Sequence, residues 1–212
     1  MLERARLDKA HENILEQIFL LGTHTGLHWL KSLAGDGVSG SVSAPTLYPS
    51  GVIPLLVTES EDEKLTLLEQ IFDGEVKGRF GAVLSQESGT NLAKYLLQKE
   101  GLPAEMLDEI RDDVLCEAGN VILNGFVATL VDALHVDLDS KTPTMQDLPR
   151  HEWMSEQDGE VELFSAGAQI VSEDKSLNEN LVFIVEIIPT KNLSVLLDKA
   201  IPLPDTGPSP GS

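Results

Sequence analysis

The two halves of this sequence repeat one order of predicted elements, at an offset of about one hundred residues. In the first half, apolar residues recur at helical steps over residues 5–34, and a second helical segment covers about 87–99. In the second half, a long helical segment covers about 103–135, and KNLSVLLDKA follows as a short one. The repeat predicts a degenerate internal duplication, since one repeat of this kind cannot bury its apolar face alone.

Between these helices, both halves are predicted to form strands. The segments LTLLEQIF and VKGRFGAVLS flank the turn signal Asp73-Gly74 and predict a hairpin, and EVELFSAGAQIVSE and NENLVFIVEIIP repeat that pairing in the second half. GSVSAPTLYP and VDLDSKTPTM are predicted extended segments. The predicted fold class is therefore α/β (α+β), in two layers, with a mainly antiparallel sheet under two long, roughly antiparallel helices on one face.

The same pattern bears on domain organisation. Each half alone offers too little core for independent stability. We therefore predict a single pseudo-symmetric domain over residues 1–201, made of two degenerate repeats at about 5–100 and 103–200. The Pro/Gly/Ser-rich tail over 202–212 is expected to be disordered.

The charge balance restricts the partners. The chain carries 35 acidic and 15 basic residues, a formal net charge of −20, which would repel nucleic acid and anionic membrane surfaces. Cys116, the one cysteine, permits no intramolecular disulfide. The charged N-terminus lacks a secretory signal, and the apolar stretch Val121–Val136 is too short to span a bilayer. A cytoplasmic location is expected.

A narrow polar stripe marks the long helix of the second half. At about 100° per residue, Asp113, Glu117, Asn120 and Asn124 fall within an arc of about 60°, with apolar residues opposite. A solvent-exposed helix face carries the same residue types. Asparagine is a mediocre helix former, however, and two of them on one stripe are a poor choice for stability alone. The stripe is thus either an exposed face or a functional site.

At these residues the chain resembles the CheC/CheX/FliY family, the phosphatases of bacterial and archaeal chemotaxis. The spacing Asp113-x3-Glu117-x2-Asn120-x22-Pro143 matches the family's signature, and EAGNVILNGFVATLVDAL is similar to its long helix. The duplicated order of elements also matches CheC. The resemblance covers most of the chain outside the tail.

The resemblance implies hydrolysis of the aspartyl phosphate of a CheY-like response-regulator receiver, in chemotaxis or a related two-component pathway. The receiver would supply the magnesium, the phosphoaspartate and a lysine, so no cofactor of the chain's own is expected. Asn120 would hold the attacking water in line with the phosphorus, and Glu117 would pair with the receiver's lysine. An amide suits this role because it forms hydrogen bonds without adding negative charge beside a phosphate.

The remaining residues of the stripe would have supporting roles. Asp113 occupies the less stringent position of the signature and would orient Glu117 or touch the partner. Pro143 would shape the extended segment beside the helix, since proline restricts the backbone and removes a donor. Asn124 lies outside the signature and is expected to make only a contact at the rim.

A second copy of the site, often present in CheC proteins, is degenerate here. Glu12 and Glu16 stand at its carboxylate positions, with Glu16 aligned to Glu117, but Phe19 stands where asparagine is expected. Phenylalanine cannot orient water, so we expect one active site per chain. No metal site is predicted, because His24 and His28 have the spacing of ligands but lack a third.

Two other functions remain open at this point. A non-catalytic adaptor that binds a receiver, a CheD-like partner or the flagellar switch would suit the degenerate first copy and the acidic surface. A hydrolase that uses Glu117 and a second carboxylate as acid and base would leave Asn120 without a role. The resemblance also allows a homodimer formed through sheet edges.

Overall fold

The computed structural model describes residues 7–156, 162–188 and 192–200, and the predicted tail lies outside this part of the chain. The first half of the chain forms the elements α1 (Lys9–Ala34), β1 (Val38–Val42), β2 (Thr46–Pro49), η1 (Ser50–Val52), α2 (Ile53–Val57), β3 (Lys64–Gly74), β4 (Lys77–Ser85) and α3 (Gln86–Lys99). The second half forms the elements η2 (Ala104–Met106), α4 (Leu107–Leu134), β5 (Leu138–Ser140), β6 (Thr144–Pro149), α5 (Arg150–Glu156), β7 (Glu162–Ser172), β8 (Asn178–Ile188) and α6 (Leu193–Leu197).

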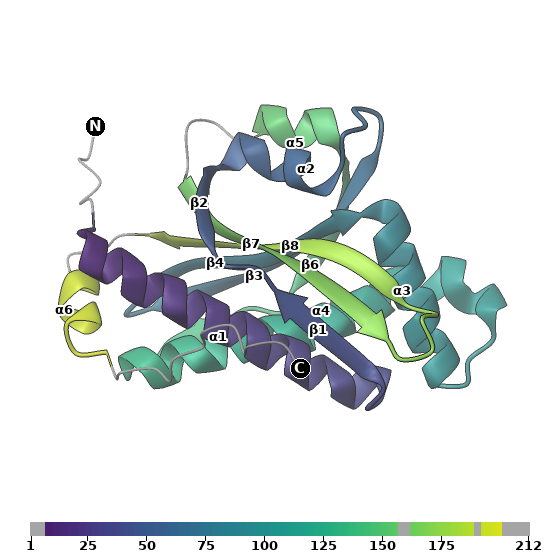
Figure 1. The fold of residues 1–212 in the computed structure, drawn as a ribbon, viewed down its shortest axis with the longest axis horizontal. Helices are drawn as coiled ribbons and strands as arrows, with labels where there is room; N and C mark the ends of the chain where they lie inside the picture. The colour runs from purple at the N-terminus through teal and green to yellow at the C-terminus, as the bar shows by residue number, and fades with distance from the viewer. Residues whose placement is uncertain (1–6, 157–161, 189–191, 201–212) are drawn as a thin grey trace.

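The described strands form one sheet in the order β1-β7-β8-β4-β3-β5, with β2 paired to β7 and β6 paired to β3. Each pairing within it is antiparallel. The long helices α1 and α4 lie on one face of the sheet, and the short helices α2 and α5 lie over the other (Figure 1). The predicted fold class is thus confirmed.

The register of the strands repeats between the halves. Ser140 on β5 pairs with Phe72 on β3, and Gly40 on β1 pairs with Ile170 on β7. Ser140 and Gly40 differ by 100 in number, whereas Ile170 and Phe72 differ by 98. The same two offsets relate the pair Pro149–Lys64 to the pair Pro49–Glu162. Each half therefore places its own short strands on the hairpin of the other half.

Equivalent positions of the two long helices also differ by 100 in residue number. Helices α1 and α4 end at Ala34 and Leu134, and each is followed by a residue with positive φ, Gly35 at 91° and His135 at 52°. Nine positions of α1 are buried, and the residue 100 positions later on α4 is buried in every case. The nine are Leu15, Ile18, Phe19, Gly22, Thr23, Gly26, Leu27, Leu30 and Ala34.

Helices α1 and α4 cross closely through glycines. A Cβ on Gly26 would lie 2.2 Å from the carbonyl oxygen of Ile122, and one on Gly22 would lie 2.7 Å from the ring of Phe126. Residue numbers rise along one helix as they fall along the other, so the pair is antiparallel, as predicted. Gly125 meets Gly26 at the same crossing. Only glycine permits this separation, because any side chain would strike backbone.

Two apolar clusters fill the two faces of the sheet. The large one lies between the sheet and α1, α3 and α4, and contains the stacked rings of Phe80 and Phe126, whose centroids are 4.0 Å apart. The small one lies under α2 and α5 and includes Ile53 and Trp153. The two-layer prediction therefore holds for the main core, and the short helices add a partial third layer.

Helix α4 has the length and apolar composition of a membrane-spanning helix, and it is the one such helix in the described ranges. It packs against α1, α3 and the sheet, and 56% of its most apolar stretch is buried inside the protein. The core helix of a soluble protein has the same composition, so this feature is weak evidence for a membrane span.

Candidate functional site

The predicted stripe lies on the outward side of α4. Asp113 and Glu117 are exposed, and Asn120 and Asn124 are half-buried. Leu115, midway between Asp113 and Glu117 in sequence and on the opposite side of the helix, is fully buried. The apolar side of α4 faces the core, as an amphipathic helix requires, and leaves the four polar side chains on one surface.

The two asparagines of the stripe are joined in a hydrogen-bonded chain that begins on the sheet. Gln70 on β3 donates from Nε2 to the carbonyl oxygen of Lys141 at 3.0 Å and to Oδ1 of Asn124 at 2.9 Å. Asn124 in turn donates from Nδ2 to Oδ1 of Asn120 at 2.9 Å. Asn124 is therefore an internal link between the sheet and Asn120, which corrects the expectation that it makes only a rim contact.

Sequence reasoning missed Gln70, although a signal was present. Side chains alternate between the faces of a strand, and Leu68, Gln70 and Phe72 are all buried and share the face of β3 that carries the main core. A glutamine between two core residues is an unusual choice, because its amide must find partners there. The alternation of side chains along β3 therefore identifies Gln70 as a polar residue on the core face of the strand.

Pro143 is buried in the segment that connects β5 to β6. Lys141, two residues earlier, donates its backbone N–H to the carbonyl of Ile71 at 2.9 Å and accepts from Gln70. The segment that Pro143 was predicted to shape thus supplies the carbonyl on which the amide chain begins.

An apolar depression of about 140 Å³ borders Glu117. Its walls come from the end of α1, the end of α3 and the first half of α4, and include Leu33, Leu96, Leu97, Leu102 and Val114. The Glu117 carboxylate therefore stands at the edge of a hydrocarbon surface. This arrangement could receive a partner that presents a cation next to apolar side chains.

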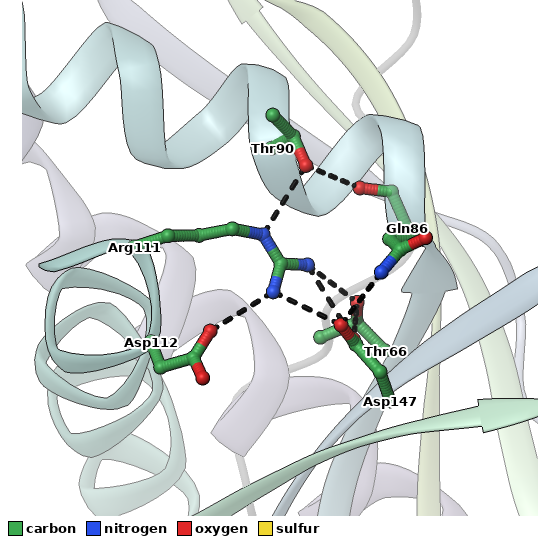
Figure 2. A network of polar contacts seen from close by, with 6 residues as sticks. All are labelled: Thr66, Gln86, Thr90, Arg111, Asp112 and Asp147. Atoms are coloured by element: carbon green, nitrogen blue, oxygen red, sulfur yellow. Dashed lines mark hydrogen bonds and ion pairs between the residues drawn. The ribbon is translucent and has the colours of Figure 1, made fainter. Parts of the chain in front are cut away.

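The first half of α4 is held by a partly buried polar network (Figure 2). Arg111 donates to the Asp147 carboxylate on β6, to Thr66 on β3 and to Thr90 on α3, with its bond from Nη1 to Oδ2 of Asp147 at 3.1 Å. Gln86 donates to the same carboxylate at 2.8 Å. The network joins three elements to the helix that carries the stripe, and its residues were not predicted.

The network also sets the pKa of Asp147. Burial of the carboxylate raises its pKa, but the hydrogen bonds from Thr66, Gln86 and Arg111 and the charge of Arg111 outweigh burial and hold it below the usual value. Asp147 is therefore ionised at neutral pH and serves as the acceptor at the centre of the network.

Cys116 lies beside the stripe and is half-buried. Burial raises the pKa of its thiol, and the neighbouring carboxylates of Asp112 and Asp113 raise it further. The thiolate is the nucleophilic form, so this environment works against nucleophilic chemistry at Cys116.

The positions of α1 that correspond to Glu117 and Asn120 are not the ones that the sequence alignment predicts. Phe19 is 1% exposed and packs edge-on against Phe80, with ring centroids 5.9 Å apart. Because burial and helix ends repeat at an offset of 100, the alignment of Glu16 with Glu117 is shifted by one residue. The sequence alignment matched residues of the same chemical type, whereas the pattern of burial shows which positions are structurally equivalent. Gln17 corresponds to Glu117, and Leu20 corresponds to Asn120.

The carboxylates of that first copy are engaged with a surface lysine. Glu12 and Glu16 lie 3.4 Å and 3.6 Å from the Lys9 ammonium. Across the ranges that the structure describes, no group of three His, Cys, Asp or Glu side chains is placed to hold a metal ion.

The fold matches that of chemotaxis and flagellar-switch proteins. FliY from Thermotoga maritima is 13% identical, with 91% of this chain and 96% of that chain covered and a TM-score of 0.67. The FliM middle domain from H. pylori is 8% identical, with 91% and 99% covered and a TM-score of 0.53, and a chain of the H. pylori FliG–FliM complex is 7% identical, with 91% and 100% covered and a TM-score of 0.59. The chemotaxis protein CheX from Desulfovibrio desulfuricans is 10% identical, with 82% and 99% covered and a TM-score of 0.50.

These neighbours confirm the resemblance at the level of the fold, which is that of the CheC/CheX/FliY family. No protein-family model matches the sequence, and no curated protein matches it. At identities this low, similarity of structure establishes the fold alone. The function must be argued from the site.

Proposed function

We propose that this protein is a cytoplasmic phosphatase that hydrolyses the aspartyl phosphate of a CheY-like receiver in chemotaxis or a related two-component pathway. The observation that carries the proposal is the placement of Glu117 and Asn120 side by side on the outward face of α4. A rigid helix can insert both side chains into a partner's site at once. The fold shared with CheX and FliY supports this reading.

Asn120 would act on the attacking water. Its Oδ1 accepts from Asn124, and the Nδ2 group donates to no described residue, so it can bind a ligand. Holding a water in line with phosphorus is most of what phosphoryl transfer asks of a protein. The receiver would bring the phosphoaspartate and its magnesium, so this chain would contribute position and not a cofactor.

Glu117 would dock the receiver. Its carboxylate is exposed at the edge of the apolar depression, where it can pair with a lysine of the partner. Asp113, one turn earlier and also exposed, would extend the acidic surface toward the same cation. Charge pairing of this kind fixes register and speeds association more than it adds affinity.

A phosphate-release assay tests the proposal. A receiver loaded from a small-molecule phosphate donor should lose phosphate faster when the protein is added. Asn120→Ala should lower kcat by about 100-fold, the cost of losing a positioned reactant. Asn13→Ala, on the exposed face of α1, is the matched control and should leave kcat unchanged.

Three results would count against this function. Activity that survives Asn120→Ala would remove Asn120 from the chemistry. Hydrolysis of a small phosphate ester without any receiver would favour carboxylate acid–base chemistry at Glu117. Binding to receivers without faster decay would favour the adaptor.

The adaptor is the second candidate because of one observation. The fold matches the FliM middle domain from H. pylori, and a chain of the H. pylori FliG–FliM complex is also similar. An adaptor of the flagellar switch, or one that binds a CheD-like protein, would use the same exposed surface of α4 without turnover. In that case Glu117→Ala should weaken binding, and Asn120→Ala should not.

A further inference from the structure

We propose that Gln70 and Asn124 are positioning residues that fix the orientation of the Asn120 amide. This inference rests on the proposed function, because it assigns a role in the same site to two residues outside the signature. It is carried by the hydrogen-bonded chain from the Lys141 carbonyl to Asn120.

The direction of the chain is set at its inner end. A backbone carbonyl can only accept a hydrogen bond, so Gln70 must turn its NH₂ group toward Lys141. That nitrogen has two hydrogens, and the second is donated to Oδ1 of Asn124. The orientation of the Gln70 amide is thus determined by the main chain.

The orientation then passes outward, one amide at a time. With Oδ1 of Asn124 turned to Gln70, its Nδ2 must face Asn120. Asn120 therefore presents its Oδ1 to Asn124, and its Nδ2 is the end left for a ligand. A free asparagine could bind a water through either end, so a chain of this kind removes one of two orientations before the substrate arrives.

Stability alone does not account for Gln70. The residue is 2% exposed, and its buried Oε1 accepts from no described residue. A buried acceptor without a partner costs stability. An apolar side chain between Leu68 and Phe72 would avoid that cost, so the glutamine is better explained by what it does for Asn124.

The other half of the molecule provides an internal comparison. By the offsets of 100 for the helices and 98 for β3 and β7, Asn120 corresponds to Leu20, Asn124 to His24, and Gln70 to Ala168. All three amides are absent together where the outer position is leucine. This is expected if the inner two exist to serve the outermost.

The test measures kcat and KM of receiver dephosphorylation in the full chain. Gln70→Met keeps the shape of the side chain and removes both donors, so kcat should fall at least tenfold with KM unchanged. The deciding readout is kcat and not the melting temperature, because the variant removes the unpaired Oε1 but also leaves the Lys141 carbonyl and Oδ1 of Asn124 without the donor that Gln70 supplies. A purely structural role predicts that kcat of the folded variant is retained.

Asn124→Asp gives a second readout. An ionised carboxylate at this position accepts from Gln70 but cannot donate to Asn120, so kcat should fall at neutral pH. As pH is lowered and the carboxyl gains its proton, donation becomes possible, and kcat relative to wild type should rise. Asn13→Asp makes the same chemical change on the exposed face of α1 and should show neither effect.

Side-chain amide NMR separates the failure of this inference from that of the proposed function. The Asn120 NH₂ signals, assigned with Asn120→Ala, should shift in Gln70→Met, because Asn124 links the two side chains by hydrogen bonds. Unshifted signals, or kcat unchanged by Gln70→Met while Asn120→Ala is inactive, would overturn the positioning role. Activity that survives Asn120→Ala overturns the proposed function, and with it the role for Gln70.

Discussion

Asn120 differs from the two carboxylates of the stripe in how its side chain is held. Glu117 and Asp113 are exposed, whereas Asn120 is tied through Asn124 to a glutamine inside the sheet. An exposed side chain samples several rotamers, and ordering it on binding costs entropy. A side chain fixed by its own fold avoids that cost, which suits a residue that must place a water to within a fraction of an ångström.

The first prediction concerns the charge at this position. Asn120→Asp keeps the shape of the side chain and can still accept from Asn124, so the free energy of unfolding should change by less than about 0.5 kcal/mol. The carboxylate would be repelled by the phosphate, and kcat should fall by about 100-fold. Chemical denaturation and phosphate release measure the two effects, and a variant as active as wild type would contradict the assigned role.

At the scale of elements, the crossing of α1 and α4 decides where the stripe lies. The helices approach through Gly22, Gly26 and Gly125, so α4 sits deep against α1 and turns its polar side outward. Arg111 then holds the first half of α4 to α3 and the sheet. Both contacts fix the position of the helix that carries Asn120.

The second prediction tests the crossing. Gly26→Ala gains about 1 kcal/mol of helix propensity, but its Cβ would lie 2.2 Å from a backbone oxygen that cannot move aside. The strain should exceed the gain and lower the free energy of unfolding by about 1–3 kcal/mol, measured in urea. Gly51→Ala is the control, because nothing lies within 4 Å of a Cβ there. Equal stabilities for the two variants would contradict the tight crossing.

The third prediction concerns pH. The pKa of Asp147 is lower in the folded state than in the unfolded chain, so its bonds stabilise the fold above the unfolded pKa. That stability is lost as pH falls through the folded-state pKa. Asp147→Asn should therefore be less stable than wild type at pH 7 and should lose less stability on acidification, measured as urea midpoints between pH 7 and 3. Asp62→Asn, in an exposed loop, should keep the wild-type profile.

The coupling between Arg111 and Asp147 can be tested by mutation at neutral pH. Arg111→Met leaves the Asp147 carboxylate partly buried, with its side chain 21% exposed, and without its cation. We expect a loss of about 2 kcal/mol in the free energy of unfolding, because an uncompensated charge costs more than the ion pair contributes. In the Asp147→Asn background the same change should cost much less, and additive effects in this double-mutant cycle would contradict a direct coupling.

At the scale of the whole molecule, the two halves are interlocked. Strands β1 and β2 pair with β7 of the second half, and β5 and β6 pair with β3 of the first. The site follows the same arrangement, because Gln70 comes from the first half and Asn120 and Asn124 from the second. Neither half holds a complete sheet or a complete amide chain.

The last prediction follows from this interlocking. Fragments of residues 1–101 and 102–212 should each lack the dispersed amide spectrum of a folded domain, because each would expose strand edges that the other half covers. Mixed or co-expressed, they should form a one-to-one complex with the spectrum of the full chain. A folded, monomeric fragment on its own would show that the repeats are independent units.

The elements themselves were predictable from local patterns. The periodicity of α1 and α4, the Asp73-Gly74 hairpin and the outward stripe all depend on residues close in sequence, for which spacing is a sufficient guide. The class of fold followed from their order. The alignment of the halves was one residue out, because matching Glu16 to Glu117 used chemical likeness where burial is the better measure.

The sequence by itself therefore determined which segments are helices and strands, and which side of α4 is polar. Only the tertiary structure decided that Gln70 reaches Asn124, 54 positions away, and that Arg111 on α4 meets Asp147 on β6, 36 positions away. The physical reason is that hydrogen-bonded partners in a core are selected by distance in space. Spacing along the sequence does not predict such partners, because they are far apart in the chain and no local pattern relates them.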